Sequence, residues 1–244
     1  MIWLRSLLYN LMFTGWTTFL CIIMLWSLLL PRARMVALMR WYLGTVDWME
    51  RVVIGLRHQV VGRENLPDGA YVIACKHQST WETQKLQLLF RDPAVVYKAE
   101  LKRIPVWGWF MARARMIAIE RTARSKALTS MVRQANQRAS DGRPIVIFPQ
   151  GSRIAPGDHA PYKPGIAALY GALNLPVVPV ALNSGVFWPR LSFVKKPGLI
   201  TVEILPPIPP GLDRRAFMER LESDLEGASN RLIAEGQAQV ASAG

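Results

Sequence analysis

A long apolar run lies near the start of the sequence, because no charged residue occurs between Arg5 and Arg32. Residues 11–30 supply the roughly 20 apolar positions that a membrane-spanning helix needs. A signal peptide has a shorter apolar region, about 7–15 residues, and ends at a small-residue cleavage site. This run ends instead in Pro-Arg-Ala-Arg at 31–34. The pattern therefore predicts a membrane anchor rather than a cleaved leader.

The next segment, residues 35–56, also has the periodicity of a helix. The apolar residues at helical spacing are Met35, Leu38, Met39, Tyr42, Leu43, Val46 and Met49. Tryptophans at positions 26, 41 and 48 suit a membrane interface. The pattern fits a single membrane span as well as two helices embedded in one leaflet. Arginines at 32, 34 and 40 favour a cytoplasmic location for the rest of the chain.

Short apolar runs alternate with helical patterns after Gly62. We predict strands over residues 71–75, 94–97, 116–119, 145–148, 177–182 and 199–205. Helices are predicted over residues 81–90, 124–140, 165–173 and 214–235, the last with Asp213 as its N-cap. This alternation predicts an α/β fold, in which a mostly parallel central sheet is flanked by helices and preceded by an N-terminal two-helix membrane-embedded segment. We expect residues 1–58 to be the membrane-anchoring helices and residues 59–244 to form the domain that carries the chemistry.

Composition adds a strong positive charge to this picture. The 244 residues include 30 Lys and Arg against 17 Asp and Glu, which gives a formal net charge of +13. Residues 98–143 alone carry eleven basic and three acidic side chains, so we expect an anionic partner such as membrane lipid or a phosphorylated substrate. No nucleic-acid recognition motif is visible, and the anchor argues against that partner. Two cysteines without a CxxC or Cys/His cluster support neither a disulfide framework nor a metal site.

His77 is the residue best placed for catalysis. It follows a predicted buried strand and precedes a helix, so it lies at the carboxyl end of a strand, where α/β proteins commonly bind ligands. Glu82 falls in the first turn of that helix. Its carboxylate can accept a hydrogen bond from one imidazole nitrogen and leave the other free to take a proton. Ser79 and Glu82 also fit a capping box, and the two roles of Glu82 are compatible.

A second polar group follows the strand predicted over residues 145–148. The sequence continues there with Gln150, Gly151, Ser152 and Arg153. Gly151 lets the backbone approach a ligand closely, Ser152 can donate a hydroxyl hydrogen bond, and Arg153 can bind a phosphate with two hydrogen bonds. An ordinary polar turn at a strand end is the alternative interpretation.

Together, the two motifs and their order resemble the lysophosphatidic acid acyltransferases of the glycerolipid acyltransferase family. That family's pattern is a His, four residues and an Asp, followed later by Phe-Pro-Glu-Gly-Thr-Arg. This sequence has His77 with Glu82, and Phe-Pro-Gln-Gly-Ser-Arg at 148–153. Other matching stretches are Lys-Ala-Glu-Leu-Lys-Arg-Ile-Pro at 98–105, the Trp-Gly-Trp turn at 107–109, Arg121, Tyr-Lys-Pro-Gly at 162–165 and Val-Pro-Val at 178–180. The resemblance extends from Gly62 to Pro210.

The resemblance implies a membrane-bound acyltransferase that moves a fatty acyl group from an acyl thioester to the 2-hydroxyl of 1-acyl-glycerol-3-phosphate, giving phosphatidic acid for phospholipid biosynthesis. His77 resembles the family's general base, with Glu82 as its partner, and no covalent acyl-enzyme is expected. The residues that resemble the substrate-binding positions are Lys98, Gln150, Gly151, Ser152 and Arg153. The donor would be acyl-CoA or acyl-carrier protein, no cofactor is implied, and the expected location is the cytoplasmic face of the bacterial inner membrane.

Four positions depart from the family's pattern, and the mildest change is Ser152 in place of Thr. Glu82 stands in place of Asp, and its extra methylene moves the carboxylate by roughly 1.5 Å, so the loop must compensate if Glu82 is to orient His77. Gln150 replaces a Glu and loses the charge. Arg115 stands where relatives commonly carry a small residue, and we expect it to crowd the site or add charge to it. Two alternatives stay open: an acyltransferase for another lysolipid acceptor, and a catalytically silent membrane protein that binds anionic lipid.

Overall fold

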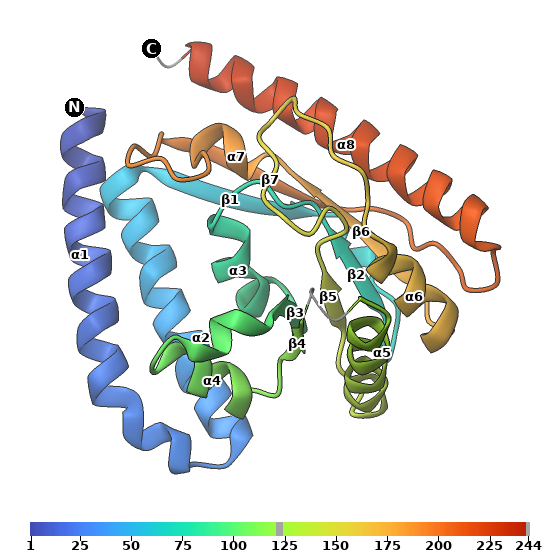
Figure 1. The fold of residues 1–244 in the computed structure, drawn as a ribbon. Coiled ribbons are helices and arrows are strands. Elements are labelled where there is room, and N and C mark those ends of the chain that lie inside the picture. The colour runs from blue at the N-terminus through green and yellow to red at the C-terminus, as the bar shows by residue number, and fades with distance from the viewer. Residues whose placement is uncertain (121–123, 243–244) are drawn as a thin grey trace.

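Seven strands form one central sheet, and helices cover both of its faces (Figure 1). The computed structural model describes residues 1–120 and 124–242. The strands are β1 (Leu56–Val61), β2 (Val72–Cys75), β3 (Ala94–Lys98), β4 (Ile117–Ile119), β5 (Ile145–Ile147), β6 (Val177–Leu182) and β7 (Gly198–Ile204). The α-helices are α1 (Ile2–Ile23), α2 (Arg32–Met49), α3 (Trp81–Leu89), α4 (Trp107–Arg113), α5 (Arg124–Ser140), α6 (Pro164–Leu173), α7 (Ser184–Phe187) and α8 (Arg214–Ser242). Shorter helical segments are η1 (Met24–Leu29), η2 (Glu50–Ile54), η3 (Arg63–Asn65) and η4 (Ala99–Arg103).

The strand order is β1-β7-β6-β2-β5-β3-β4, and all neighbouring strands are parallel except β6 and β7. Six of the strands match the six predicted apolar runs. Strands buried on both faces of a parallel sheet consist largely of Val, Ile and Leu, which makes them visible in the sequence. The predicted α/β class with a mostly parallel sheet is confirmed.

The edge strand β1 lies outside the predicted strands, and the helix predicted through residue 56 is wrong at its end. Residues 50–54 form a π-helical turn that ends at Gly55, whose φ of 77° is left-handed. From Leu56 onward the chain is extended and pairs with β7 in parallel, with Leu56 opposite Gly198. Exposed and buried positions alternate along β1, so it lacks the continuous apolar run of a central strand.

The helices α1 and α2 form an antiparallel pair on the same face of the sheet as α3 (Figure 1). Together with η1, α1 extends over 28 residues and is long and apolar enough to span a membrane. Its outer face exposes large apolar side chains, but its inner face belongs to the protein core. Tyr9 is fully buried in the same hydrophobic cluster as Ile73 of β2 and Val180 of β6. The N-terminal helices therefore complete the core of the globular part.

Helices α5, α6 and α8 cover the opposite face of the sheet (Figure 1). Met131 of α5 and Phe217 of α8 are fully buried in one cluster with Ile145 of β5. The predicted N-cap of α8 is confirmed, because Asp213 accepts the backbone N–H of Ala216 at 3.0 Å. The helix continues beyond its predicted end at residue 235. The segment at 107–109, which the sequence suggested as a turn, is instead the start of α4.

A buried ion cluster joins the N-terminal helices to α3. The Lys85 ammonium lies 2.8 Å from Asp47 Oδ1 and 2.8 Å from Glu50 Oε2, and all three side chains are buried. Trp81 donates its indole N–H to Glu50 at 3.1 Å, and Tyr9 donates its hydroxyl to the same carboxylate at 3.4 Å. Because an unpaired buried charge is costly, this cluster fixes α2 against α3.

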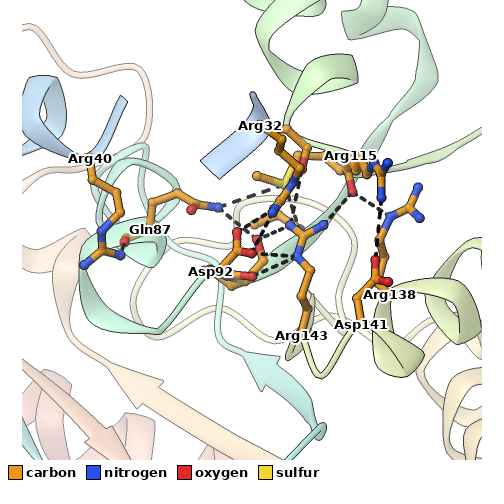
Figure 2. A network of polar contacts seen from close by, with 12 residues as sticks. Arg32, Arg40, Gln87, Asp92, Arg115, Arg138, Asp141 and Arg143 are labelled. Atoms are coloured by element: carbon orange, nitrogen blue, oxygen red, sulfur yellow. Dashed lines mark hydrogen bonds and ion pairs between the residues drawn. The ribbon is translucent and has the colours of Figure 1, made fainter. Parts of the chain in front are cut away.

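A second polar network lies at the amino-terminal ends of β3, β4 and β5 (Figure 2). The buried Arg143 guanidinium donates to four backbone carbonyls, among them those of Ala114 and Arg115. The Asp92 carboxylate is shared between Arg143 and Arg32, the first residue of α2. This network ties the start of α2 to the sheet.

Candidate active site

The carboxyl ends of β2 and β5 meet where the chain connections diverge. From β2 the chain passes through α3 to β3, whereas from β5 it passes through α6 to β6, on the other side of β2. The helices α3 and α6 pack in separate clusters on opposite faces of the sheet (Figure 1). Such a switch point leaves a crevice outside the strand ends, where open α/β sheets bind ligands. His77 follows β2 into this region, and residues 150–153 follow β5.

His77 and Glu82 form a hydrogen-bonded pair. His77 Nδ1 lies 2.7 Å from Glu82 Oε1, and the Glu82 side chain is fully buried while that of His77 is 12% exposed. An ionised carboxylate only accepts hydrogen bonds, so Nδ1 carries the proton and Nε2 holds a lone pair. Within the described part of the chain, no residue bonds Nε2. The carboxylate of Glu82 therefore contacts the histidine, although the Glu82 side chain is one methylene longer than the Asp of the family's pattern.

Further hydrogen bonds hold the Glu82 carboxylate in place. Its Oε1 also accepts the backbone N–H groups of Gln78 at 2.8 Å and Ser79 at 2.7 Å. Its Oε2 accepts the hydroxyl of Ser184 at 2.7 Å. The bond to Ser79 is one half of the predicted capping box, and the Ser79 hydroxyl accepts a backbone N–H of the first helical turn at 3.1 Å. Glu82 thus caps α3 and contacts His77 at the same time.

Two contacts hold the second motif beside the histidine. The Phe148 ring stacks on the His77 imidazole, with ring centroids 4.0 Å apart and planes inclined by 21°. The Ile154 backbone N–H donates to the His77 carbonyl at 2.8 Å. Residues 150–153 lie between these two contacts in the sequence. The structure therefore brings the two predicted motifs together.

Gln150 and Arg153 carry buried polar atoms that have no partner among the described residues. Gln150 is 2% exposed, and neither its Oε1 nor its Nε2 is hydrogen-bonded; Arg153 Nε is buried and unpaired as well. Native proteins seldom leave buried polar atoms unpaired, since each costs about 1–3 kcal/mol. Gly151 has a φ of 70°, which glycine adopts without strain, and Ser152 is exposed. The segment therefore offers hydrogen-bonding atoms to a ligand.

Lys98 ends β3, the neighbour of β5, so its exposed side chain lies at the same end of the sheet as Gln150. Across residues 1–120 and 124–242, no hydrogen bond joins Lys98 to the other predicted site residues. Arg121, which contributes to the family resemblance, lies outside the described residues.

Arg115 lies away from the site, so the expectation that it crowds or charges the site is wrong. It precedes β4 at the amino-terminal end of the strands, where its carbonyl accepts hydrogen bonds from Arg138 and Arg143 (Figure 2). Its φ of 55° is left-handed, which disfavours residues with a Cβ. Part of the positive charge of residues 98–143 thus serves a network far from the site.

Ser184 and Gln78 join the site without having been predicted. Ser184 is fully buried and donates to Glu82, and the Gln78 side-chain carbonyl accepts the Gly185 N–H at 3.0 Å. These bonds couple the loop that carries His77 to the start of α7. In the sequence, Ser184 is visible only as a polar residue just after the strand predicted over residues 177–182. Its position does not reveal that it contacts Glu82.

The cysteine nearest to His77 does not compete with it as a reactive group. Burial and the nearby charge of Glu82 raise the pKa of Cys75 well above that of a free thiol, so the thiol stays protonated. The other histidines are paired elsewhere: His58 lies 3.2 Å from Asp47, and His159 lies 2.8 Å from an exposed glutamate of α8.

Comparison with known proteins identifies the family of the chain. The Acyltransferase family model matches residues 57–183, which include His77, Glu82 and the 150–153 segment. A 1-acyl-sn-glycerol-3-phosphate acyltransferase of Pseudomonas aeruginosa is 41% identical over 159 residues, or 65% of this chain and 62% of that protein. The protein of the same name from Saccharomyces cerevisiae is 30% identical over 163 residues, or 65% of this chain and 54% of that protein. The chain thus aligns with less than two thirds of the length of these relatives.

Among solved structures, the crystal structure of the 1-acyl-sn-glycerophosphate (LPA) acyltransferase PlsC from Thermotoga maritima has the same fold. The TM-score is 0.75, and the match covers 96% of this chain and 97% of that one at 21% sequence identity. The family model matches more than half of the 244 residues, and both motifs that meet at the switch point lie inside the match. By this match the chain is a member of the acyltransferase family.

Proposed function

We propose that this acyltransferase moves a fatty acyl group from an acyl thioester to the 2-hydroxyl of 1-acyl-glycerol-3-phosphate and so makes phosphatidic acid for phospholipid synthesis. The observation that carries the proposal is the His77–Glu82 pair held beside residues 150–153 at the switch point. The names of the relatives in P. aeruginosa and S. cerevisiae indicate the same acceptor.

His77 is the general base in this proposal. Because Glu82 keeps the proton of the imidazole on Nδ1, Nε2 can accept the proton of the acceptor hydroxyl. The hydroxyl oxygen then attacks the thioester carbonyl carbon, an ester C–O bond forms and the C–S bond breaks. The leaving thiolate takes the proton from the imidazolium. The step balances without an oxidant or reductant.

Transfer is direct rather than through a covalent acyl-enzyme. The usual enzyme nucleophile in acyl transfer is a thiol or hydroxyl that an adjacent base activates. The Cys75 thiol is buried with a raised pKa, and the Ser184 hydroxyl is committed to Glu82. The acceptor hydroxyl is then the group that His77 deprotonates.

The phosphate of the acceptor binds to Arg153 and Lys98 in this proposal, beside Gln150, Gly151 and Ser152. A guanidinium pairs with phosphate through two parallel hydrogen bonds, and the Arg153 Nε donor is buried and unpaired. Gln150 favours an anionic ligand more than a glutamate would, because its amide adds no negative charge beside the phosphate.

We place the protein at the cytoplasmic face of the bacterial inner membrane, with residues 1–58 as its membrane-anchoring part and residues 59–244 as its catalytic part. Two ion pairs tie the N-terminal segment to the globular part: the partly buried pair of Arg32 with Asp92 and the buried pair of Glu50 with Lys85. A full crossing by α1 would carry these charged groups into hydrocarbon, which is costly. Both helices therefore lie in one leaflet, with the exposed apolar face of α1 toward the acyl chains.

The test is an acyl-transfer assay with purified protein and 1-acyl-glycerol-3-phosphate as the acceptor. The donor is either acyl-CoA or acyl-carrier protein, each with a radiolabelled acyl group. Wild-type protein is expected to make phosphatidic acid, and His77→Ala is expected to lower the rate by about 10²–10⁴-fold while the variant stays folded and membrane-bound. His159→Ala, which removes a surface histidine, is the control and should keep full activity.

Full activity of His77→Ala would overturn the role of His77. Transfer to a different lysolipid would reassign the acceptor. Absence of turnover with both donors would favour the catalytically silent, lipid-binding alternative.

A further inference from the structure

Residues 189–197, the loop between α7 and β7, are fastened to the start of α1. The buried Lys195 donates its ammonium to Asn10 Oδ1 at 2.6 Å. Its backbone N–H donates to the Ser6 hydroxyl at 3.0 Å, and its carbonyl lies 3.3 Å from the same hydroxyl. Its ammonium also lies 5.0 Å from the centroid of the Trp188 ring. This 189–197 loop is therefore held rigidly against the first helix.

The tip of the 189–197 loop consists of Leu191 and Phe193, and both face outward. Leu191 is 87% exposed and has a φ of 59°, a conformation that strains a leucine. Phe193 is 42% exposed and stacks on Trp3 of α1, which is 67% exposed, with ring centroids 5.4 Å apart. Loop tips that face water usually carry small polar residues. A strained, exposed leucine beside two exposed aromatic rings therefore indicates an interaction surface.

This tip continues the apolar outer face of α1. Leu4 and Leu7 follow Trp3 on that helix and are exposed as well. Basic residues flank the tip, with Arg190 exposed on one side and Lys196 partly exposed on the other. Apolar and aromatic side chains bordered by cations complement the acyl chains and anionic headgroups of a bilayer surface.

The base of the 189–197 loop touches the candidate active site. Arg190 donates from Nη1 to the Arg153 backbone carbonyl at 3.2 Å. The loop also follows directly on α7, whose first residue, Ser184, bonds Glu82. A contact that fixes the tip of the 189–197 loop would therefore also fix the Arg153 side of the candidate site.

We propose that the 189–197 loop is a second membrane contact, separate from α1 and α2, whose tip enters the lipid leaflet beside Trp3. This contact sets the Arg153 side of the site against the bilayer surface, so that a lysolipid reaches His77 from the leaflet and not through water. The inference rests on the proposed membrane location and lipid acceptor.

The first test places a fluorescent label at the tip. The background is Cys21→Ala, and the remaining Cys75 is buried and out of reach of the reagent. In this background, Leu191→Cys is labelled with a nitrobenzoxadiazole dye. The labelled protein is studied in vesicles of phosphatidylethanolamine and phosphatidylglycerol. Leu212→Cys, at another exposed leucine just before α8, is the matched control. We expect lipids with a shallow spin label to quench the dye at position 191 several-fold more than the dye at position 212. Equal quenching of both positions by aqueous iodide would overturn the proposal.

The second test separates lipid contact from chemistry. The double variant Leu191→Ser, Phe193→Ser is compared with Leu212→Ser on long-chain lysophosphatidic acid in vesicles and on a short-chain analogue dissolved as monomers. We expect the double variant to raise the apparent KM for the vesicle substrate about ten-fold and to leave turnover of the soluble analogue unchanged. Equal losses on both substrates, or no loss on either, would contradict the proposal. If wild-type protein acylates neither substrate, the proposed function fails, while the label still measures the contact of the loop with lipid.

Discussion

Ser184 donates its hydroxyl to Oε2 of Glu82 at 2.7 Å, while the other oxygen of that carboxylate faces His77. The serine belongs to the start of α7, and the two residues are 102 positions apart in the chain. A carboxylate bonded on both oxygens cannot rotate away from the imidazole. Ser184 is therefore a positioning residue for the proposed base.

Ser184→Ala is expected to lower kcat about ten-fold with little change in KM, because it removes a contact to Glu82 and none to substrate. It also leaves one buried carboxylate oxygen with one hydrogen bond fewer, at a cost of about 1–3 kcal/mol in unfolding free energy. Ser229→Ala is the control, since the Ser229 hydroxyl is buried without a partner among the described residues and its removal should be neutral. Equal loss of kcat in both variants would contradict the role of Ser184.

Glu82→Gln separates the two roles of that side chain. The amide oxygen can still accept the N–H groups of Gln78 and Ser79, so the cap of α3 is kept, but the negative charge beside His77 is lost. We expect kcat to fall by about 10–10²-fold and the acid limb of the pH–rate profile to move to lower pH, because a neutral amide stabilises the imidazolium less. A variant with full activity and an unchanged profile would leave Glu82 as a helix cap only.

Lys85→Met should destabilise the protein by roughly 3–5 kcal/mol, measured by denaturant unfolding in detergent, because it leaves Glu50 and Asp47 buried without their shared cation. Burial raises the pKa of Glu50, and the Lys85 charge opposes that rise. A group with a raised folded-state pKa stabilises at low pH and loses this contribution as pH rises. The stability of Lys85→Met should therefore fall more steeply than that of wild type between about pH 5 and 8.

The matched control for Lys85→Met also carries Asp47→Asn and Glu50→Gln, which removes the charges left without a cation. This triple variant should recover most of the lost stability. A single variant as stable as wild type at neutral pH would argue that the cluster contributes nothing.

Arg115→Gly tests whether this arginine belongs to the backbone network or to the active site. Because the φ of Arg115 is 55°, glycine should relieve strain and raise the unfolding free energy by up to about 1 kcal/mol, with unchanged acyl-transfer activity. Arg133→Gly, at an exposed position inside α5, should lower stability by about 1 kcal/mol instead. A drop in kcat for Arg115→Gly alone would return this residue to the site.

The sequence predicts the central strands well because burial on both faces makes them continuous apolar runs, as in β6. It does not predict β1, whose alternating exposed positions at the sheet edge resemble the polar end of a helix. The Trp-Gly-Trp stretch resembles a turn, and packing beside η1 and η4 makes it the start of α4. Local patterns thus predict an element where burial is uniform, and they are less reliable at the margins of the fold.

The pairing of His77 with Glu82 could be predicted because five positions separate them across one helix start. Ser184 could not be, since its contact depends on how α7 turns back over the end of β2. The same holds for Lys85 and Asp47, which are 38 positions apart. Arg115 was misplaced because the resemblance alone suggested a place at the site, whereas the residue precedes β4 and so lies at the amino-terminal end of the strands. Tertiary contacts, rather than local residue patterns, determine these features of the fold and of the site.

The position of β7 between β1 and β6 has a consequence for synthesis of the chain. Among the strands that the structure describes, β1 is synthesised first, yet its neighbour in the sheet is β7, which is synthesised last. The hydroxyl of Ser6 likewise gains its partner, the backbone N–H of Lys195, only after 189 further residues have been synthesised. The segment that holds α1 and β1 must therefore persist without these partners until residues 195–204 have been synthesised, in surroundings that tolerate its apolar surface. Insertion of β7 between β1 and β6 then completes the sheet, and the preceding loop at the same time supplies the contacts that hold α1.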